Sequence, residues 1–181
     1  MYILASASPR RKELLSLITT DFKIVLSGEE ETVPNNIPPE KQPEYLARLK
    51  ALSVSRNYPE YTVIGADTSV IADGKILGKP KNRSEAWDMI TALSGSTHKV
   101  ITGCAIVKKG VCRSFSKETL VEFYALDERE IEEYISTDEP YDKAGAYGIQ
   151  GRGALLVKGI KGDYFNVVGL PVAALKRELG V

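Results

Sequence analysis

Histidine and cysteine are scarce in this chain of 181 residues, and its positive and negative charges cancel. With a single histidine, His98, a His-rich zinc site or a Ser-His-Asp triad is hard to assemble. The two cysteines, Cys104 and Cys112, are typical of reduced thiols and not of a disulfide framework. Because 24 Lys and Arg residues balance 24 Asp and Glu residues, no net positive field exists to hold a nucleic acid. Any anion-binding site must therefore be local.

Long apolar runs are also missing from the sequence. No stretch approaches the roughly 20 residues that a membrane-spanning helix needs. Met1–Ala5 is apolar but short, and the polar segment that follows it at once does not fit a signal peptide. The proportions of hydrophobic residues (43%) and charged residues (27%) are ordinary for a soluble globular protein. We therefore expect a single cytoplasmic domain, residues 1–181, with neither a membrane nor a nucleic acid as its partner.

The pattern of apolar residues predicts strands interleaved with helices. The predicted strands are Tyr2–Ala5, Phe22–Leu26, Tyr61–Ala72, Lys75–Leu77, His98–Lys108, Cys112–Tyr124, Ala154–Ile160 and Tyr164–Val168. The predicted helices are Arg10–Leu17, Gln42–Arg56, Ser84–Leu93, Glu128–Ser136 and Pro171–Leu179. Because two long strands form an antiparallel hairpin around Lys109-Gly110, we expect an α/β fold with a mixed, twisted sheet and flanking helices, and not an all-parallel sheet.

A first candidate site lies where the first predicted strand meets the first predicted helix, in Ser6-Ala7-Ser8-Pro9-Arg10-Arg11. Backbone N–H groups and the dipole at a helix N-terminus attract phosphate. Two hydroxyls and the guanidinium groups of Arg10 and Arg11 would add further donors. The segment indicates an anion site, although a capped surface helix with solvated arginines explains the same residues.

Two charged residues lie in or beside predicted strands. Asp67, in Gly65-Ala66-Asp67-Thr68, would be costly to bury among apolar neighbours without a partner, unless strand alternation turns it toward solvent. Lys79, in Gly78-Lys79-Pro80, follows a predicted hairpin at Asp73-Gly74. Its place suits phosphate capture, but it also fits an ordinary exposed turn lysine.

Several other polar positions have a plain structural explanation as well as a functional one. Glu30 and Glu31 lie in a polar loop and fit solvated side chains. Lys50 lies beside the predicted apolar helix face of Leu46 and Leu49, where a lysine commonly extends to solvent. His98 follows a predicted helix end and fits a structural hydrogen-bonding role better than that of a catalytic base.

The longest candidate motif is a glycine-rich segment that spans residues 141–153. Four glycines in nine positions, 145–153, allow the backbone to approach a ligand closely. Polar groups that complement them come from Asp142, Lys143, Gln150 and Arg152. Because Tyr, Ile and Ala alternate with the glycines, we expect an ordered, packed loop with a binding function and not a flexible linker.

The motifs also follow one another in a recognisable order. They are SxSPRR at Ser6–Arg11, LARxKA at Leu46–Ala51, GADT at Gly65–Thr68, GKP at Gly78–Pro80, SGxxH at Ser94–His98, DKAGAYGIQG at Asp142–Gly151 and GDYxNVVGLP at Gly162–Pro171. Together they resemble the Maf family of nucleotide pyrophosphatases, originally associated with septum formation. The resemblance implies a fold similar to that of inosine triphosphate pyrophosphatases, with two lobes around a cleft, and a homodimer.

The same resemblance implies metal-dependent cleavage between the α- and β-phosphates of a nucleoside triphosphate, with Mg²⁺ or Mn²⁺ as the cation. Asp67 matches the catalytic acid/base proposed for the family. Glu31, Lys50 and Lys79 match its active-site carboxylate and lysines, with Glu30 as the alternative to Glu31 because three successive glutamates allow a one-residue slip.

Base choice is implied by three further matches, Arg10, Thr68 and Gln150, which resemble the members that hydrolyse dTTP and UTP. The GIQG form of the glycine-rich loop favours that pyrimidine branch over the branch acting on 7-methyl-GTP. A glutamine carboxamide such as that of Gln150 satisfies both the O4 acceptor and the N3 donor of uracil or thymine, and Thr68 would assist it.

Together these residues are consistent with hydrolysis of a nucleoside triphosphate at the α-phosphorus. Water attacking the α-phosphorus needs a base and cations that neutralise the charge developing on pyrophosphate. Asp67 and Glu31 would supply oxygen ligands to the metal, and Asp67 would position or deprotonate the water, directly or through that metal. The phosphates would be bound by Ser8, Arg10, Arg11, Lys50 and Lys79.

Two other classes of protein compete with an enzyme. A nucleotide-binding regulator of septum formation would use the same phosphate-binding residues with little turnover. Carboxylates beside a polyphosphate hinder binding unless a cation bridges them, which favours the enzyme. An RNA-binding domain fits poorly, because the chain is neutral and has no aromatic and basic platform.

Overall fold

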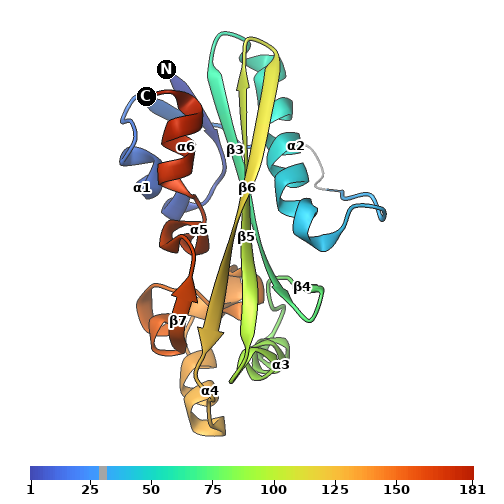
Figure 1. Ribbon diagram of the computed structural model, residues 1–181, viewed down its shortest axis with the longest axis vertical. Helices are drawn as coiled ribbons and strands as arrows, with labels where there is room; N and C mark the ends of the chain where they lie inside the picture. Colours follow the sequence, from blue (N-terminus) through green and yellow to red (C-terminus); the bar gives the residue numbers. More distant parts are fainter. Residues whose placement is uncertain (29–31) are drawn as a thin grey trace. The chain divides into compact units, whose positions relative to one another are not determined.

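The computed structural model describes residues 1–28 and 32–181. Its strands form one seven-stranded sheet with the order β2-β1-β3-β5-β6-β7, and β4 pairs with β3 (Figure 1). The chain forms two compact units, of which the first contains residues 1–68, 102–117 and 169–181 and the second contains residues 69–101 and 118–168. Three long strands, β3 (Thr62–Ala72), β5 (Thr97–Lys108) and β6 (Val111–Phe123), contribute residues to both units. The predicted mixed sheet with flanking helices is confirmed.

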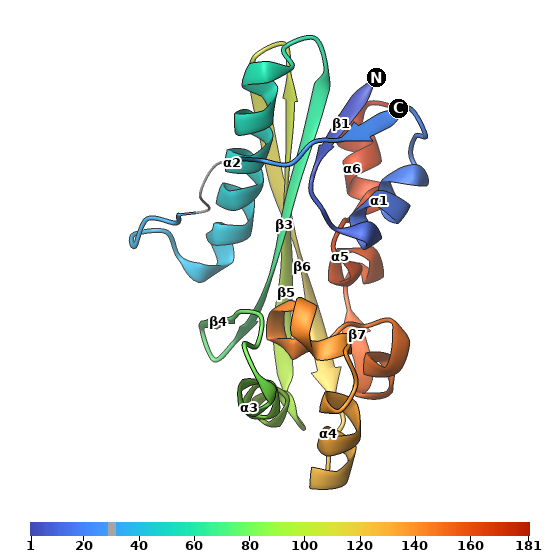
Figure 2. The same ribbon diagram turned by 180° about the vertical axis from the view of Figure 1, so that it is seen from behind.

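The first unit is built on parallel strands. β1 (Tyr2–Ala5) pairs with β2 (Phe22–Ile24) on one side and with β3 on the other. The helix α1 (Pro9–Ser16) lies between β1 and β2 in the chain, and α2 (Gln42–Asn57), preceded by the short turn Pro39–Lys41, leads to β3. The two helices cover opposite faces of these strands, and α6 (Val172–Leu179) lies on the same side as α1 (Figures 1 and 2).

The buried face of α2 is not centred on Leu46 and Leu49. Leu46 and Leu49 are only half buried, whereas the fully buried positions are occupied by Pro43, Ala47, Ala51 and Val54. The reason is close packing against the sheet, because a side chain on Gly65 of β3 would clash with the backbone carbonyl of Ala47. Small residues on the helix and the strand let the two backbones approach each other.

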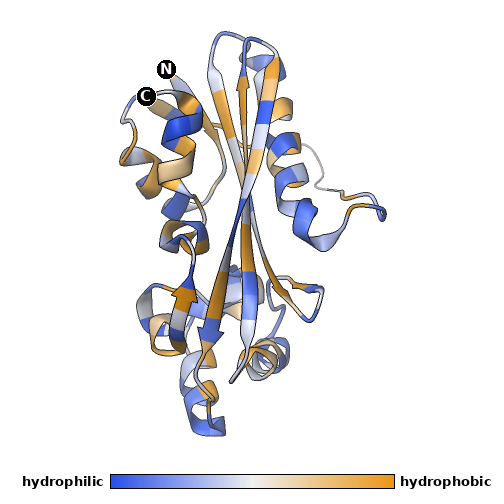
Figure 3. Ribbon diagram, viewed as in Figure 1, coloured by the Kyte–Doolittle hydropathy of each residue, from blue (hydrophilic) through white to orange (hydrophobic). Residues whose placement is uncertain are grey.

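The second unit contains the remaining elements. Its helices are α3 (Arg83–Leu93), α4 (Glu128–Ile135) and α5 (Tyr164–Val168), and its shorter strands are β4 (Lys75–Leu77) and β7 (Val157–Lys161). Short 3₁₀ turns cover Glu139–Asp142, Ala144–Ala146 and Gly151–Leu155. The helices mix hydrophobic and hydrophilic residues along their length, as expected for helices with one buried face (Figure 3). None of the helices in the described ranges is long and apolar enough to cross a membrane.

The predicted strand at Tyr164–Val168 is wrong, because these residues form α5. Asp163 accepts a hydrogen bond from the Phe165 backbone N–H at 2.8 Å, which starts a turn of helix. The side chain of Asn166, which is fully buried, donates to the Val100 carbonyl and to Thr119 Oγ1, both at 3.0 Å. The apolar run in the sequence resembles a strand, but its local polar bonds favour a helical turn.

Candidate active site

The first unit reverses its strand order at β1. The chain moves from β1 to β2 on one side and then returns to β3 on the other side. In open α/β sheets, ligands bind at such reversal points, outside the carboxyl ends of the strands. The pairing of β1 with β3 ends at Ala5 opposite Gly65, so Ala66, Asp67 and Thr68 extend beyond the end of β1. The structure therefore brings GADT to the place where SxSPRR begins.

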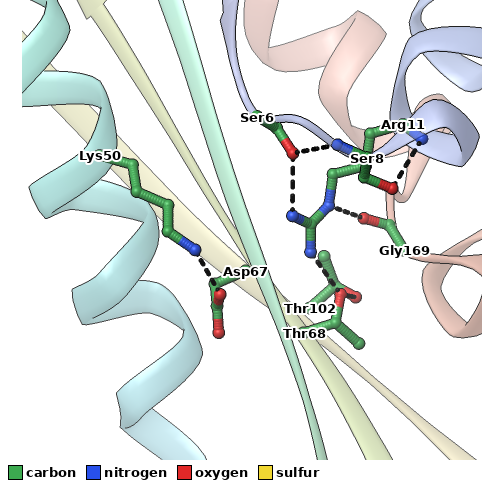
Figure 4. A network of polar contacts seen from close by, with 8 residues as sticks. All are labelled: Ser6, Ser8, Arg11, Lys50, Asp67, Thr68, Thr102 and Gly169. Carbon is green, nitrogen blue, oxygen red and sulfur yellow. Dashed lines mark hydrogen bonds and ion pairs between the residues drawn. The ribbon is translucent and has the colours of Figure 1, made fainter. Parts of the chain in front are cut away.

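Asp67 has a partner on the α2 side of β3. Its Oδ1 lies 2.7 Å from Nζ of Lys50, and the two side chains are 17% and 11% exposed (Figure 4). The ion pair offsets the cost of removing a carboxylate from water among apolar neighbours. Neither residue is the solvated surface group that the sequence also allowed. The pair gives this end of the strands a carboxylate and an ammonium group side by side.

Arg11 lies on the other side of β3 and joins three segments of the first unit (Figure 4). Its Nε donates to the Gly169 carbonyl at 2.9 Å, its Nη1 to Ser6 Oγ at 3.2 Å, and its Nη2 to Thr68 Oγ1 at 3.1 Å. Thr68 Oγ1 also lies 2.8 Å from Oγ1 of the fully buried Thr102. The planar guanidinium group thus fixes Thr68, which we predict to contact the base, relative to the start of α1.

Ser8 and Arg10 lie at the N-terminus of α1. Ser8 is the predicted N-cap, and its Oγ accepts a hydrogen bond from the Arg11 backbone N–H at 3.4 Å, while Pro9 is the first helical residue. The backbone N–H of Ser8 donates to Ser6 Oγ at 3.3 Å. Ser8 and Arg10 are both half buried. The predicted capped helix is confirmed, and its positive dipole end lies next to the GADT segment.

Two further predicted site residues, Lys79 and Gln150, belong to the second unit, and both are exposed. The segments that carry them are joined, because the Gly145 backbone N–H donates to the Gly78 carbonyl at 3.0 Å. A Cβ on Gly145 would lie 2.8 Å from Val70 Cγ1, so a larger residue there would force the loop away from β3. The structure therefore places the GKP turn against the glycine-rich loop, as one ordered surface of this unit.

Sequence reasoning missed two residues of the Arg11 network, Thr102 and Gly169. Thr102 is a hydroxyl inside the continuously buried run Ile101–Val107, and a buried hydroxyl in an apolar strand commonly marks a hydrogen-bond network. Gly169 lies inside the GDYxNVVGLP motif and has a φ of 129°, where side chains rarely fit. The sequence context of each residue indicates a special role, but spacing alone does not predict that both join the network around Arg11.

His98 has the structural role that its sequence position predicts. Its ring is buried, with Nε2 2.7 Å from the Tyr147 hydroxyl and edge-to-face packing against Phe123. Burial lowers the pKa of His98 to about 4, so the ring is neutral near pH 7. Cys104 and Cys112 are free thiols, and burial raises the pKa of Cys104 to about 12, which makes it unreactive.

The site chemistry fits a divalent cation bound together with a substrate. Mg²⁺ prefers oxygen ligands and commonly takes one or two carboxylates plus phosphates and waters. Asp67 offers one such carboxylate, while Glu30 and Glu31 lie outside the described residues. Within residues 1–28 and 32–181, no cluster of three or more His, Cys, Asp or Glu residues forms a complete protein cage for a metal. Asp67 would supply one oxygen ligand to such a cation.

Known proteins resemble this chain along its whole length. The family model described as Maf-like protein matches residues 1–180. A dTTP/UTP pyrophosphatase of Bacillus cytotoxicus is 51% identical over 178 residues, and one of Bacillus cereus is 50% identical over 177 residues. Each alignment covers 98% of this chain and 93% of the relative. Among solved structures, a HAM1 protein from Coxiella burnetii has a similar fold, with a TM-score of 0.55 and 12% identity over 99% of this chain and 98% of the other. The chain belongs to the Maf-like protein family.

Proposed function

We propose that this chain is a nucleoside triphosphate pyrophosphatase that hydrolyses dTTP and UTP to the monophosphate and pyrophosphate. The observation that carries the proposal is the Lys50–Asp67 pair, which lies where β3 extends beyond β1. The substrates are proposed from the relatives that are about half identical to this chain and are named dTTP/UTP pyrophosphatases. The predicted homodimer and cytoplasmic location belong to the same proposal, supported by the family resemblance.

In this proposal Asp67 positions and deprotonates the water that attacks the α-phosphorus. Lys50 is a compact charge on a flexible stem, so its ammonium group can turn from Asp67 to a phosphate oxygen when the triphosphate arrives. Ser8, Arg10 and the first turn of α1 add donors and positive potential for the phosphates. Bound Mg²⁺ would neutralise charge on the phosphates, with Asp67 and Glu31 as its protein ligands.

The other predicted residues have supporting roles in the proposal. Lys79 would bind phosphate through its exposed ammonium group, and Gln150 would contact O4 and N3 of the pyrimidine. Thr68 would contact the base from a fixed position, because Arg11 and Thr102 bond its hydroxyl. Arg11 would thus contribute by fixing Thr68, whose hydroxyl it bonds.

Pyrophosphate release from dTTP and UTP in the presence of Mg²⁺ tests the proposal. We expect both to give pyrophosphate and the monophosphate, with GTP a poor substrate. Asp67→Asn should lower kcat by about 100-fold or more, because general bases commonly contribute that much. Orthophosphate as the product would contradict cleavage between the α- and β-phosphates, and full activity of Asp67→Asn would remove Asp67 from the mechanism. Tight UTP binding without turnover would instead support the nucleotide-binding regulator.

A further inference from the structure

The turn that follows Gln150 has an unusual cap. The 3₁₀ turn Gly151–Leu155 begins directly after Gln150, which has extended backbone angles of φ −95° and ψ 168°. Ser, Thr, Asp or Asn at this position commonly caps a turn with its own side chain, and glutamine does not belong to this group. In the described part of the chain the Gln150 side chain makes no such bond.

Glu139 supplies the cap instead. Its Oε1 accepts a hydrogen bond from the Arg152 backbone N–H at 2.9 Å, and its Oε2 accepts one from the Gly153 backbone N–H at 3.1 Å. These are the second and third amides of the turn, which an N-cap side chain would otherwise satisfy. A Cβ on Gly151 would lie 2.6 Å from Glu139 Oε1, so the glycine makes room for the carboxylate. The 3₁₀ turn Gly151–Leu155 is thus capped by a side chain from the separate segment Glu139–Asp142.

Glu139 is itself held in place. Lys143 Nζ donates to the Glu139 carbonyl and to Asp142 Oδ1, both at 2.6 Å. The Lys143 side chain is 16% exposed, and its methylene groups lie under Gly148, where a Cβ would be 2.9 Å from Cδ and Cε. Lys143 therefore contacts the glycine-rich loop before Gln150, at Gly148, and the Glu139 carboxylate bonds the loop after Gln150.

The cap by Glu139 also affects the Gln150 side chain. Gln150 is exposed, whereas its neighbour Ile149 is 8% exposed and anchors the loop. A backbone that is already fixed reduces the entropy lost when the carboxamide binds a ligand. Because Glu139 caps the turn, the carboxamide keeps both its acceptor and its donors available.

We propose that Glu139 is a positioning residue for base recognition, which caps the turn in place of Gln150 and so presents the Gln150 carboxamide to the pyrimidine. The inference rests on the proposed function, because it needs Gln150 to contact the base. Uracil and cytosine differ at C4 and N3, where the first has an acceptor and a donor and the second has a donor and an acceptor. Because a carboxamide can turn to match either base, discrimination needs a loop position that admits only the orientation that pairs with uracil, and the cap by Glu139 would hold the loop in that position.

The test is steady-state pyrophosphate release from UTP and CTP by the full chain. Glu139→Ala should lower kcat/KM for UTP about tenfold, mainly by raising KM, and should affect CTP less, because only the uracil contact is tuned by the loop. Glu139→Gln keeps one carbonyl acceptor and should fall between Glu139→Ala and the native chain. Glu133→Ala is the matched control, since Glu133 is an exposed glutamate of the same unit that pairs with Arg129.

A double substitution separates positioning from plain loop stability. When Gln150→Ala is already present, adding Glu139→Ala should leave the UTP-to-CTP ratio of kcat/KM unchanged. Equal losses for UTP and CTP, or a second drop of the same size in the double variant, would overturn the inference. If Glu139→Ala melts below the assay temperature, Glu139→Gln replaces it, and a native ratio in that variant overturns the inference too.

The two proposals fail in different ways in this experiment. If the native chain releases no pyrophosphate from UTP, the proposed function fails. If the native chain is active but Glu139→Ala loses UTP and CTP activity equally, only the positioning role of Glu139 fails.

Discussion

Lys50 and Asp67 pair where little water reaches them, so removing Lys50 leaves the Asp67 carboxylate poorly compensated. We expect Lys50→Met to lower the free energy of unfolding by about 3 kcal/mol, because an uncompensated and mostly buried carboxylate remains. Urea denaturation followed by circular dichroism measures the change. Lys99→Met is the matched control, since its pair with Glu118 is 41% and 45% exposed and should contribute less than about 1 kcal/mol. Equal losses in the two variants would contradict this account.

In the proposed site Arg11 would act through the shape of its guanidinium group as well as through its charge. We expect Arg11→Lys to lower kcat/KM for UTP by about 10- to 100-fold, because a single ammonium group cannot reach Gly169, Ser6 and Thr68 together. Pyrophosphate release measures the loss. Arg113→Lys, at an exposed position, should keep native activity. Native kinetics for Arg11→Lys would show that charge alone is needed.

His98 makes stability depend on pH. Its pKa in the folded chain is about 4, below the ordinary value of 6.5, so between these values the unfolded chain binds a proton that the folded chain does not. The free energy of unfolding should therefore fall as the pH drops from 6.5 to 4, by roughly 3 kcal/mol in total.

His98→Gln tests this dependence, because glutamine retains hydrogen-bonding groups but does not titrate. Its unfolding free energy should change less between pH 6.5 and pH 4 than that of the native chain, measured by urea titrations at each pH. As His98 is the sole histidine, its ring resonances in an NMR titration report the folded pKa directly. A folded pKa near 6.5 would rule out the predicted effect.

Single-residue chemistry was partly predictable from the sequence. A carboxylate inside an apolar strand signalled that Asp67 needed a partner, and Lys50 was a candidate for the same site. The sequence did not show that the two would pair with each other, because they meet through tertiary packing. The same limit applies to Glu139, whose amide partners lie 13 and 14 residues further along the chain.

Close packing between α2 and the sheet depends on glycine in the strands. A Cβ on Gly65 would meet the Ala47 carbonyl, and one on Gly103 would meet the backbone of Pro43 and Glu44. We expect Gly65→Ala or Gly103→Ala to lower the free energy of unfolding by about 2 kcal/mol or more, because backbone cannot move aside cheaply.

Thermal melts of these variants test that expectation, with Gly159→Ala as the control. No described atom lies within 4 Å of a Cβ placed on Gly159, and its φ is outside the positive range. Gly159→Ala should therefore leave the melting temperature nearly unchanged. Native melting temperatures for Gly65→Ala and Gly103→Ala would mean that α2 does not pack as closely as described.

Elements with strong local signals were predicted correctly. The Asp127–Glu130 capping box is present at the start of α4, and positive φ angles at Asp73 and Gly74 form the predicted hairpin turn. The strand predicted at α5 was wrong because it was inferred from large apolar residues, whereas polar turn bonds determine the structure there.

At the scale of the whole molecule, the long β5–β6 hairpin correctly predicted a mixed sheet. The position of β1 between β2 and β3 was not predictable, because strand order depends on contacts distant in sequence. In the proposed site that order matters, since it creates the reversal point where Asp67 and Thr68 extend beyond the end of β1.

In the proposed reaction this chain directs water to the α-phosphorus of a pyrimidine triphosphate, and Asp67 positions and deprotonates that water. Hydrolysis of UTP in water enriched in oxygen-18, followed by mass spectrometry of both products, tests this most directly. We predict that the label appears in UMP and not in pyrophosphate, and that Asp67→Asn forms labelled UMP at least about 100-fold more slowly. Label in pyrophosphate, or native rates in Asp67→Asn, would contradict the account.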